Sequence, residues 1–351
     1  MGEELWNIDF GQIQEFLSET IELQNISFQD IVKSLLSGDI SSALSVIFQA
    51  AVHVFSREIA ANRSFFLQIL LIALFSALFT VFASVFENSQ IADVGFYVSY
   101  LLMITFLTAS MTLTIQIAVE VVKNLTGFMK AFIPAFAMAI TFTSGSVTAM
   151  AYYESVFLLA YGVEYALCWG IIPLIRVQVL LALVSHISRE DVLSRLQQLV
   201  RTVCDWSLRT LLTAVLGVQA LQNLLVPYIH GTKAGIVQKA VSAIPGIGDG
   251  VQSVTDMILG GGVIIKNGIG GAALILVVLL CIVPLIKLAV IYLMYQITAA
   301  IVQPMADIRM VDGIQCGAEA CRFLIRAVFL CGLLFFITIA LTCSATGRTA
   351  F

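Results

Sequence analysis

Four charged side chains interrupt long apolar stretches and are the residues best placed to do chemistry here: Glu154, Glu164, Arg176 and Lys287. Charges inside such stretches are costly to place in a membrane, so they usually face a bundle interior or water. Lys287 lies near the middle of the apolar run 271–300, three residues after Pro284. Two interpretations remain open: a lysine that lines a pore or couples to an ion, and a structural ion pair with Glu154 or Glu164.

A second pattern, Gly246-Ile-Gly-Asp249, has the Gly-x-Gly-Asp form of intramembrane aspartyl proteases. That chemistry needs a second aspartate opposite the first, so that the two share a proton. No other aspartate interrupts an apolar stretch, and glycine and aspartate are ordinary turn residues. The sequence also has no zinc-protease, Walker or nucleophile-elbow motif and only three histidines. We therefore expect no enzymatic activity, no metal and no cofactor, and any ATP hydrolysis must come from a partner.

The composition indicates what must position these side chains. Of the 351 residues, 60% are hydrophobic and 11% are charged, with a mean hydropathy of +0.99. Soluble domains carry about 25% charged residues, and so few polar groups could not cover a soluble surface of this size. The composition excludes a soluble enzyme, a nucleic-acid binder and a disordered scaffold. It predicts an all-α, polytopic helical protein in contact with membrane lipid.

Residues 1–64 form an acidic N-terminal region, with nine acids against three bases, in a chain of net charge −4. An acidic surface repels nucleic acid and anionic lipid. From Asp39 to Ile59 the apolar residues keep helical spacing, which indicates an amphipathic helix. That helix either packs on its neighbours or lies in the membrane interface.

A membrane-spanning helix needs about 20 apolar residues. The runs of that kind are 65–86, 94–119, 147–168, 170–187, 206–226, 271–300 and 320–345. With a shorter run at 128–143, they predict seven to eight crossings within a transmembrane domain at 65–345, followed by a short tail at 346–351.

Two segments are interrupted by proline and glycine. The run 128–146 contains Pro134 and ends in Ser-Gly-Ser, and the segment 233–262 has Pro245, Gly246 and Gly248 at its centre. Neither reads as a full span, and both suit a re-entrant or broken helix inside a protein-lined part of the membrane. A faint similarity between 130–148 and 239–255 also suggests an internal repeat, of the type that places a site or pore between two halves.

Arginines mark two connections between the spans. Four lie at 188–209 and three at 303–326, and the positive-inside rule puts both connections in the cytoplasm. If 128–143 counts as a crossing, the acidic N-terminal region is then extracytoplasmic.

Longer strings are particular to one family. The sequence contains Thr213-Ala-Val-Leu-Gly-Val-Gln-Ala-Leu-Gln222, Ala243-Ile-Pro-Gly-Ile-Gly248, Gly262-Val-Ile-Ile-Lys-Asn-Gly-Ile-Gly270, Ile282-Val-Pro-Leu-Ile-Lys287 and Ala299-Ala-Ile-Val-Gln-Pro304. These strings resemble stage III sporulation protein AE, over roughly residues 60–345. The family usually opens with a signal sequence, a pattern that the first residues of this chain do not show.

The resemblance implies a multi-pass cell-membrane component of the secretion-like channel between mother cell and forespore, in the mother-cell membrane around the forespore. It implies as partners the other stage III sporulation A-operon proteins, which include an ATPase and ring-forming components, and the forespore protein Q. It carries over no catalytic residue. Association of several copies, the transported substrate and the gating mechanism stay open.

A second function remains compatible with the residues. A self-contained secondary transporter could place a midplane site at the two broken segments and Lys287. The two functions differ in autonomy, because only the transporter should move a solute when the purified protein is alone in liposomes. A purely structural anchor, the third class, should tolerate substitutions in the broken segments.

Overall fold

The computed structural model describes residues 40–85, 89–144, 146–186, 193–230 and 248–345. Apart from short turns, these residues are helical: α3 (Ile40–Val85), α4 (Ser89–Ser144), α5 (Ser146–Tyr165), η2 (Ala166–Ile171), α6 (Ile172–Ser185), α7 (Ser194–His230), α9 (Gly248–Val302) and α10 (Ile308–Ala345). No strand occurs among the residues described. The all-α class expected from the composition is confirmed.

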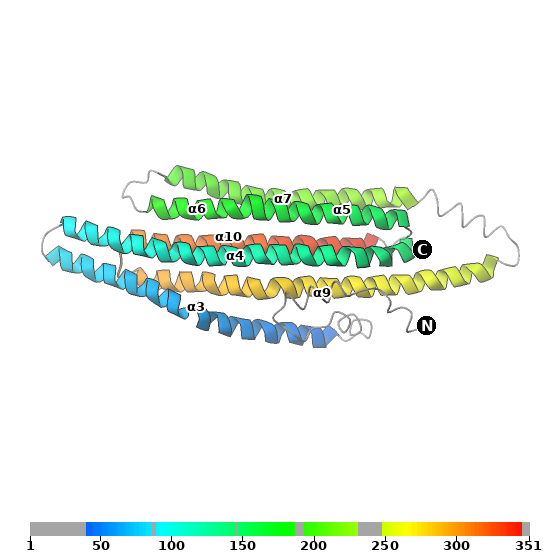
Figure 1. Cartoon of the computed structure of the whole chain (residues 1–351), viewed down its shortest axis with the longest axis horizontal. Coiled ribbons are helices and arrows are strands. Elements are labelled where there is room, and N and C mark those ends of the chain that lie inside the picture. The colour runs from blue at the N-terminus through cyan, green and yellow to red at the C-terminus, as the bar shows by residue number, and fades with distance from the viewer. Residues whose placement is uncertain (1–39, 86–88, 145, 187–192, 231–247, 346–351) are drawn as a thin grey trace.

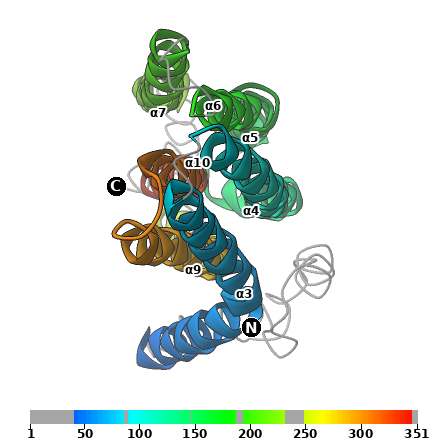
Figure 2. The ribbon, with the colours of Figure 1, turned by 90° about the vertical axis from the view of Figure 1, so that its left-hand side faces the viewer.

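The helices lie along one long axis and reverse direction at each connection (Figure 1). α5, the single π-helical segment η2 and α6 follow one another in a single pass, so the described helices make six passes. α10 packs against α9, α4, α6 and α7, while α3 lies on the outside against α9 and α4. Viewed from one end, α3 and α7 stand at opposite edges of the bundle (Figure 2).

Large side chains fill the space between the helices. The largest that are fully buried include Tyr100, Tyr295, Phe128, Phe323 and Phe335. Two glycines of α10 let its backbone approach α9 closely: a Cβ on Gly317 would lie 2.9 Å from the Tyr295 ring, and one on Gly332 would overlap the Cys281 sulfur. Small residues at such crossings are typical of helix packing in membranes.

Five helical stretches of the described residues are long and apolar enough to cross a membrane. They are Phe55–Leu78, Val94–Thr141, Tyr152–Ser185, Asn267–Val302 and Ile308–Ser344. The expected count of seven to eight crossings is therefore not confirmed. The run 206–226 belongs to α7, which carries more polar residues and is not among the five.

Two pairs of expected runs fall in single passes. The runs 94–119 and 128–143 are both part of α4, which is 56 residues long and continues through Pro134. The runs 147–168 and 170–187 are joined by η2, so a π-helical turn stands where a connection was expected. The re-entrant segment expected at 128–146 is not confirmed: as far as Ser144 its residues continue α4 without turning back. The polar residues between the runs do not end the helix.

Some of the segments predicted from the sequence lie partly or wholly outside the residues that the structure describes. Residues 1–39 lie outside them, and 40–64 belong to α3, continuous with the first span. Residues 231–247, with Pro245 and Gly246, also lie outside, whereas 248–262 begin α9 and run on into the span at 271–300. The arginines expected in connections lie mostly on helices, because α7 begins at Ser194 and α10 at Ile308.

Candidate functional site: charged pairs inside the bundle

Lys287 pairs with a carboxylate that the sequence did not suggest. Its ammonium Nζ lies 3.8 Å from Glu58 Oε1 of α3, with the two side chains 26% and 15% exposed. The amide of Asn62 donates to the other oxygen of Glu58, Oε2, at 3.2 Å. All three residues lie within apolar spans. The pair thus joins α3 to α9 through opposite charges that are partly shielded from solvent.

Pro284 is buried in α9, one turn before Lys287. A proline inside a helix removes one backbone hydrogen bond, so α9 is locally weakened next to its only charge between residues 267 and 302. The ammonium of Lys287 and the break in the hydrogen-bond ladder therefore stand together, as the sequence spacing predicts. The contact of Lys287 with α3 depends on the tertiary fold, so the sequence spacing does not predict it.

Glu164 has a different cation as its partner. Its Oε2 accepts a hydrogen bond from Lys130 Nζ of α4 at 3.1 Å. The same ammonium lies 4.0 Å from the centre of the Tyr161 ring, a cation–π geometry. One helical turn beyond Lys130, the half-buried Pro134 lies in the same helix. This cluster ties α4 to α5, and it leaves Glu164 committed to Lys130 rather than to Lys287.

Glu154 and Arg176 are both exposed. Neither has an ion pair with a described residue. The four charges that the sequence singled out therefore do not form one site. Lys287 and Glu164 each bind a partner from another helix, and Glu154 and Arg176 point away from the interior.

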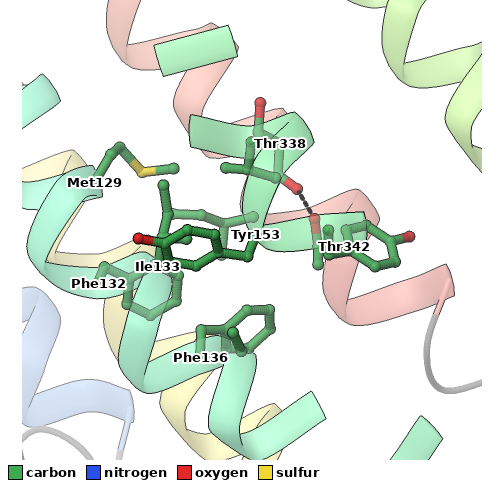
Figure 3. A pocket seen from close by; sticks show the side chains of 11 residues that line it. Met129, Phe132, Ile133, Phe136, Tyr153, Thr338 and Thr342 are labelled. Carbon is green, nitrogen blue, oxygen red and sulfur yellow. Dashed lines mark hydrogen bonds between the residues drawn. The ribbon is translucent and has the colours of Figure 1, made fainter. Parts of the chain in front are cut away.

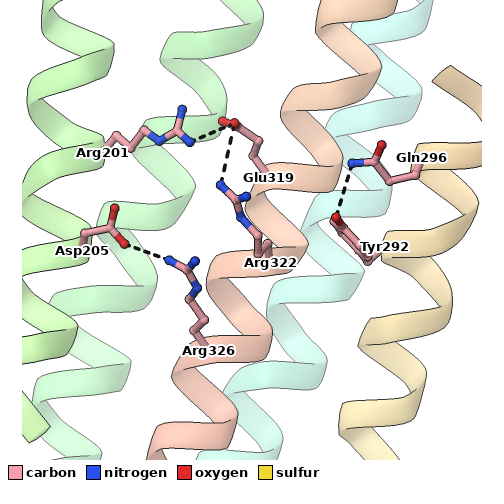
Figure 4. A network of polar contacts seen from close by, with 7 residues as sticks. All are labelled: Arg201, Asp205, Tyr292, Gln296, Glu319, Arg322 and Arg326. Atoms are coloured by element: carbon pink, nitrogen blue, oxygen red, sulfur yellow. Dashed lines mark hydrogen bonds and ion pairs between the residues drawn. The ribbon is translucent and has the colours of Figure 1, made fainter. Parts of the chain in front are cut away.

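A larger polar network joins α7 to α10 (Figure 4). Arg201 Nη2 lies 3.1 Å from Glu319 Oε1, which is also 4.0 Å from Arg322 Nη2. One turn along, Arg326 Nη1 donates to Asp205 Oδ1 at 3.0 Å. The arginines of the two expected connections thus meet on neighbouring helices. Sequence reasoning counted them only for topology, although their spacing of three and four residues on α10 already puts Glu319, Arg322 and Arg326 on one helix face.

A small pocket lies between α4, α5 and α10 (Figure 3). Its volume is about 20 Å³, enough for about one water molecule. Aromatic and aliphatic side chains line most of it, and Thr338 and Thr342 turn their hydroxyls to carbonyls of their own helix. The buried hydroxyl of Tyr152 has no hydrogen-bond partner among the described residues.

The cysteines are free thiols, and five of the seven are buried. Cys316 Sγ lies 3.9 Å from Nδ1 of His186, the residue that follows α6, a neighbour that the sequence does not place beside it. Within the described part of the chain, no three metal-binding side chains come together. Gly248 is the first residue of α9, whereas Pro245 and Gly246 lie outside the described residues.

Glu58 is the functional residue that sequence reasoning missed. It was counted as part of the acidic N-terminal region. A signal was present, because no proline or glycine separates 40–64 from the run 65–86, and an unbroken helix carries Glu58 into the first span.

The sequence comparisons decide the family. The family profile described as "Stage III sporulation protein AE" matches residues 26–346. This chain belongs to the stage III sporulation protein AE family. A curated relative, the Stage III sporulation protein AE of Bacillus subtilis (strain 168), is 22% identical over 348 residues, covering 99% of this chain and 85% of the relative. No solved structure matches the chain.

Membership gives the AE chain a role in sporulation, and the apolar helices place it in a membrane. The resemblance seen in the sequence is confirmed over most of the chain. The similarity extends to both ends of the bundle, so the fold described above is the body of an AE protein.

Proposed function

We propose that this AE protein is a membrane subunit of the secretion-like channel complex that links mother cell and forespore during endospore formation. It resides in the mother-cell membrane around the forespore. It acts with the other stage III sporulation A-operon proteins, whose ATPase supplies energy and whose ring-forming components extend the path, and with the forespore protein Q.

The observation that supports this proposal most is a pair of charged contacts that involve the apolar spans of a sporulation-family membrane protein. Lys287–Glu58 joins two of these spans, and Arg201–Glu319 joins the span on α10 to α7. Lys287–Glu58 and Arg201–Glu319 are both partly exposed. Charged groups at membrane depth that keep some exposure are typical of proteins with a polar path through the bundle or between subunits. A lipid anchor alone has no need of them.

The alternative is the self-contained transporter, for which Lys287 beside Pro284 in α9 is the specific observation. The two functions differ in whether the protein moves a solute without partner proteins. The purified AE protein is reconstituted alone into liposomes loaded with small anionic and cationic dyes, and dye release is followed with and without a proton or sodium gradient. We expect the dye to be released no faster than from dye-loaded liposomes without protein, because the channel needs its partners. Gradient-dependent, saturable release by the AE protein alone would instead establish the transporter.

A further inference from the structure

The polar network on α7 and α10 lies at the same height along the bundle axis as exposed aliphatic side chains on other helices. We call this height the level of the network. Tyr295 of α9 defines this level, because its hydroxyl donates to Ser110 of α4 at 2.7 Å and its ring lies 5.0 Å from that of Phe66 of α3. Gly317 of α10 lies against the same ring. Glu319 follows two residues later, about 3 Å along the helix axis.

At this level the other helices expose aliphatic side chains. Leu67 of α3, Leu113 of α4 and Ile297 of α9 are 56%, 63% and 57% exposed. All three lie in apolar spans, as does Glu319. One cross-section of the bundle therefore has leucine and isoleucine on one side and an arginine–carboxylate network on the other.

The network keeps a substantial part of its surface open. The side chains of Arg201, Glu319 and Arg322 are 41%, 33% and 41% exposed, and those of Arg326 and Asp205 are 52% and 36% exposed. The Nε of Arg322 is buried and has no partner among the described residues. Exposed guanidinium and carboxylate groups are costly against hydrocarbon, so this side of the cross-section is not turned to lipid tails.

Polar side chains extend this face toward the N-terminal ends of both helices. Gln315 lies one turn before Glu319 on α10, and Gln198 lies one turn before Arg201 on α7; both are exposed. Beside the polar face, the N-terminal half of α7 also exposes an apolar stripe of Leu196, Leu199, Val203 and Trp206. Farther along, the exposed large side chains are Val218 and Leu221 on α7 and Phe329 and Phe336 on α10. The polar face is thus confined to the N-terminal halves of α7 and α10.

We propose that this α7–α10 face, formed by Gln198, Arg201, Asp205, Gln315, Glu319, Arg322 and Arg326, lines a water-filled path at membrane depth. The inference deepens the proposed function and rests on it for the identity of the path as a channel. Rings of arginine or lysine line pores that pass anions and phosphates.

The sign of the charge favours anionic solutes. Arg195 and Arg209 are also exposed on α7, so the N-terminal half of α7 and the network carry five arginines. The acids of this region are Asp205 and Glu319. Five positive and two negative charges give a net charge of +3. A positive lining raises the local concentration of anions and lowers that of cations.

Cysteine accessibility tests the inference directly. Gln198→Cys and Gln315→Cys probe the polar face, and Leu67→Cys and Leu113→Cys are matched controls on the lipid side of the same level. Each is made in a background with the seven native cysteines replaced by alanine. If that background does not sporulate, only the half-buried Cys168 and Cys343 are replaced, and labelling is counted above the native level. Membranes from sporulating cells are treated with the impermeant thiol reagents sulfonatoethyl and trimethylammonioethyl methanethiosulfonate.

We expect both glutamine positions to react and both leucine positions to stay unlabelled. After normalisation to a free thiol, the anionic reagent should react about 3–10 times faster than the cationic one. Labelling of the glutamine positions only after detergent purification would overturn the inference, since a protein or lipid would then cover the face. Equal labelling of all four positions would overturn it too, because the whole level would lie in water. A faster cationic reagent would overturn the anion assignment. These outcomes decide whether the face is open to water and not which partners the protein has, so the proposed function keeps its own test.

Discussion

Lys287 and Glu58 are opposite charges held 3.8 Å apart between two apolar helices. A lysine at the centre of a span costs about 2.5–3.5 kcal/mol on insertion scales, and the carboxylate offsets part of that cost once the bundle is assembled. Asn62 fixes the carboxylate from its own helix. Removal of either charge leaves the other one without its partner.

We therefore expect Lys287→Leu to destabilise the AE protein by roughly 1–3 kcal/mol, as for a partly buried charge left unpaired. Its abundance in sporulating membranes, measured by immunoblot, should fall. Adding Glu58→Gln should restore the abundance, whereas adding Glu154→Gln, at an exposed site, should not. If Lys287→Leu keeps normal abundance but blocks sporulation, the lysine acts in a pore and not in an ion pair.

Lys130 makes two contacts with α5, an ion pair with Glu164 and a cation–π contact with Tyr161. Lys130→Met should lower the stability of the detergent-purified protein by about 0.5–2 kcal/mol, as measured by thermal unfolding followed with circular dichroism. Lys123→Met is the matched control, an exposed lysine two turns earlier on the same face of α4, and it should change the transition by less because it has no ion pair with a described residue. Equal shifts for the two variants would show that the contacts of Lys130 add nothing.

At the scale of elements, the close approach of α9 and α10 depends on glycine. Tyr295 is fully buried and hydrogen-bonded to Ser110, so its ring cannot move away from a side chain added at Gly317. Elsewhere a glycine has no such role. A Cβ on Gly162 of α5 would meet nothing within 4 Å.

Gly317→Ala should thus destabilise the protein by about 1–3 kcal/mol through overpacking. Gly162→Ala should stabilise it by about 0.5–1 kcal/mol, because alanine is the better helix former. Both changes are read from thermal unfolding in the same detergent. The opposite signs are the test, and a neutral Gly317→Ala would mean that α9 and α10 do not pack as described.

Element boundaries show how far the sequence could predict this fold. The helical class follows from composition, and each expected apolar run falls inside a helix. The apolar runs 94–119 and 128–143 are separated by charged residues such as Glu120 and Lys123. A charged residue does not end a helix when its side chain can reach solvent or a partner. The pairing of Glu58 with Lys287 and of Arg201 with Glu319 depends on which helices become neighbours, and one sequence does not contain that information.

At the scale of the whole molecule, helix length sets the relation to the bilayer. The apolar stretch Val94–Thr141 of α4 has 48 residues and is about 72 Å long at 1.5 Å per residue. The hydrocarbon core of a bilayer is about 30 Å thick. Part of the bundle must therefore extend beyond the hydrocarbon or be covered by partner proteins, which is consistent with a subunit of a larger assembly.

The six passes also bear on orientation. The connection at 303–307 lies at the end of the bundle opposite Ala345 (Figure 1). With the end of the bundle that carries Arg195 and Arg309 in the cytoplasm, single cysteines at Gln303 and, in the acidic N-terminal region, at Ser27 should label from opposite sides with an impermeant reagent in a cysteine-free background. With the protein produced in the cell membrane of non-sporulating cells, where the reagent reaches the outer face, position 27 should react in intact cells and position 303 only after permeabilisation. The reverse pattern would invert the assigned orientation.

The central claim, that this AE protein works as a subunit of a multiprotein channel, is tested most directly by cross-linking in sporulating cells. The protein is tagged, cross-linked at the stage of forespore engulfment and purified, and the linked peptides are identified by mass spectrometry. The account predicts cross-links to the A-operon ATPase and to the ring-forming proteins, lost when those partners are deleted. Recovery of the AE protein free of these partners, from cells in which they are present and the cross-linker has reacted, would contradict it.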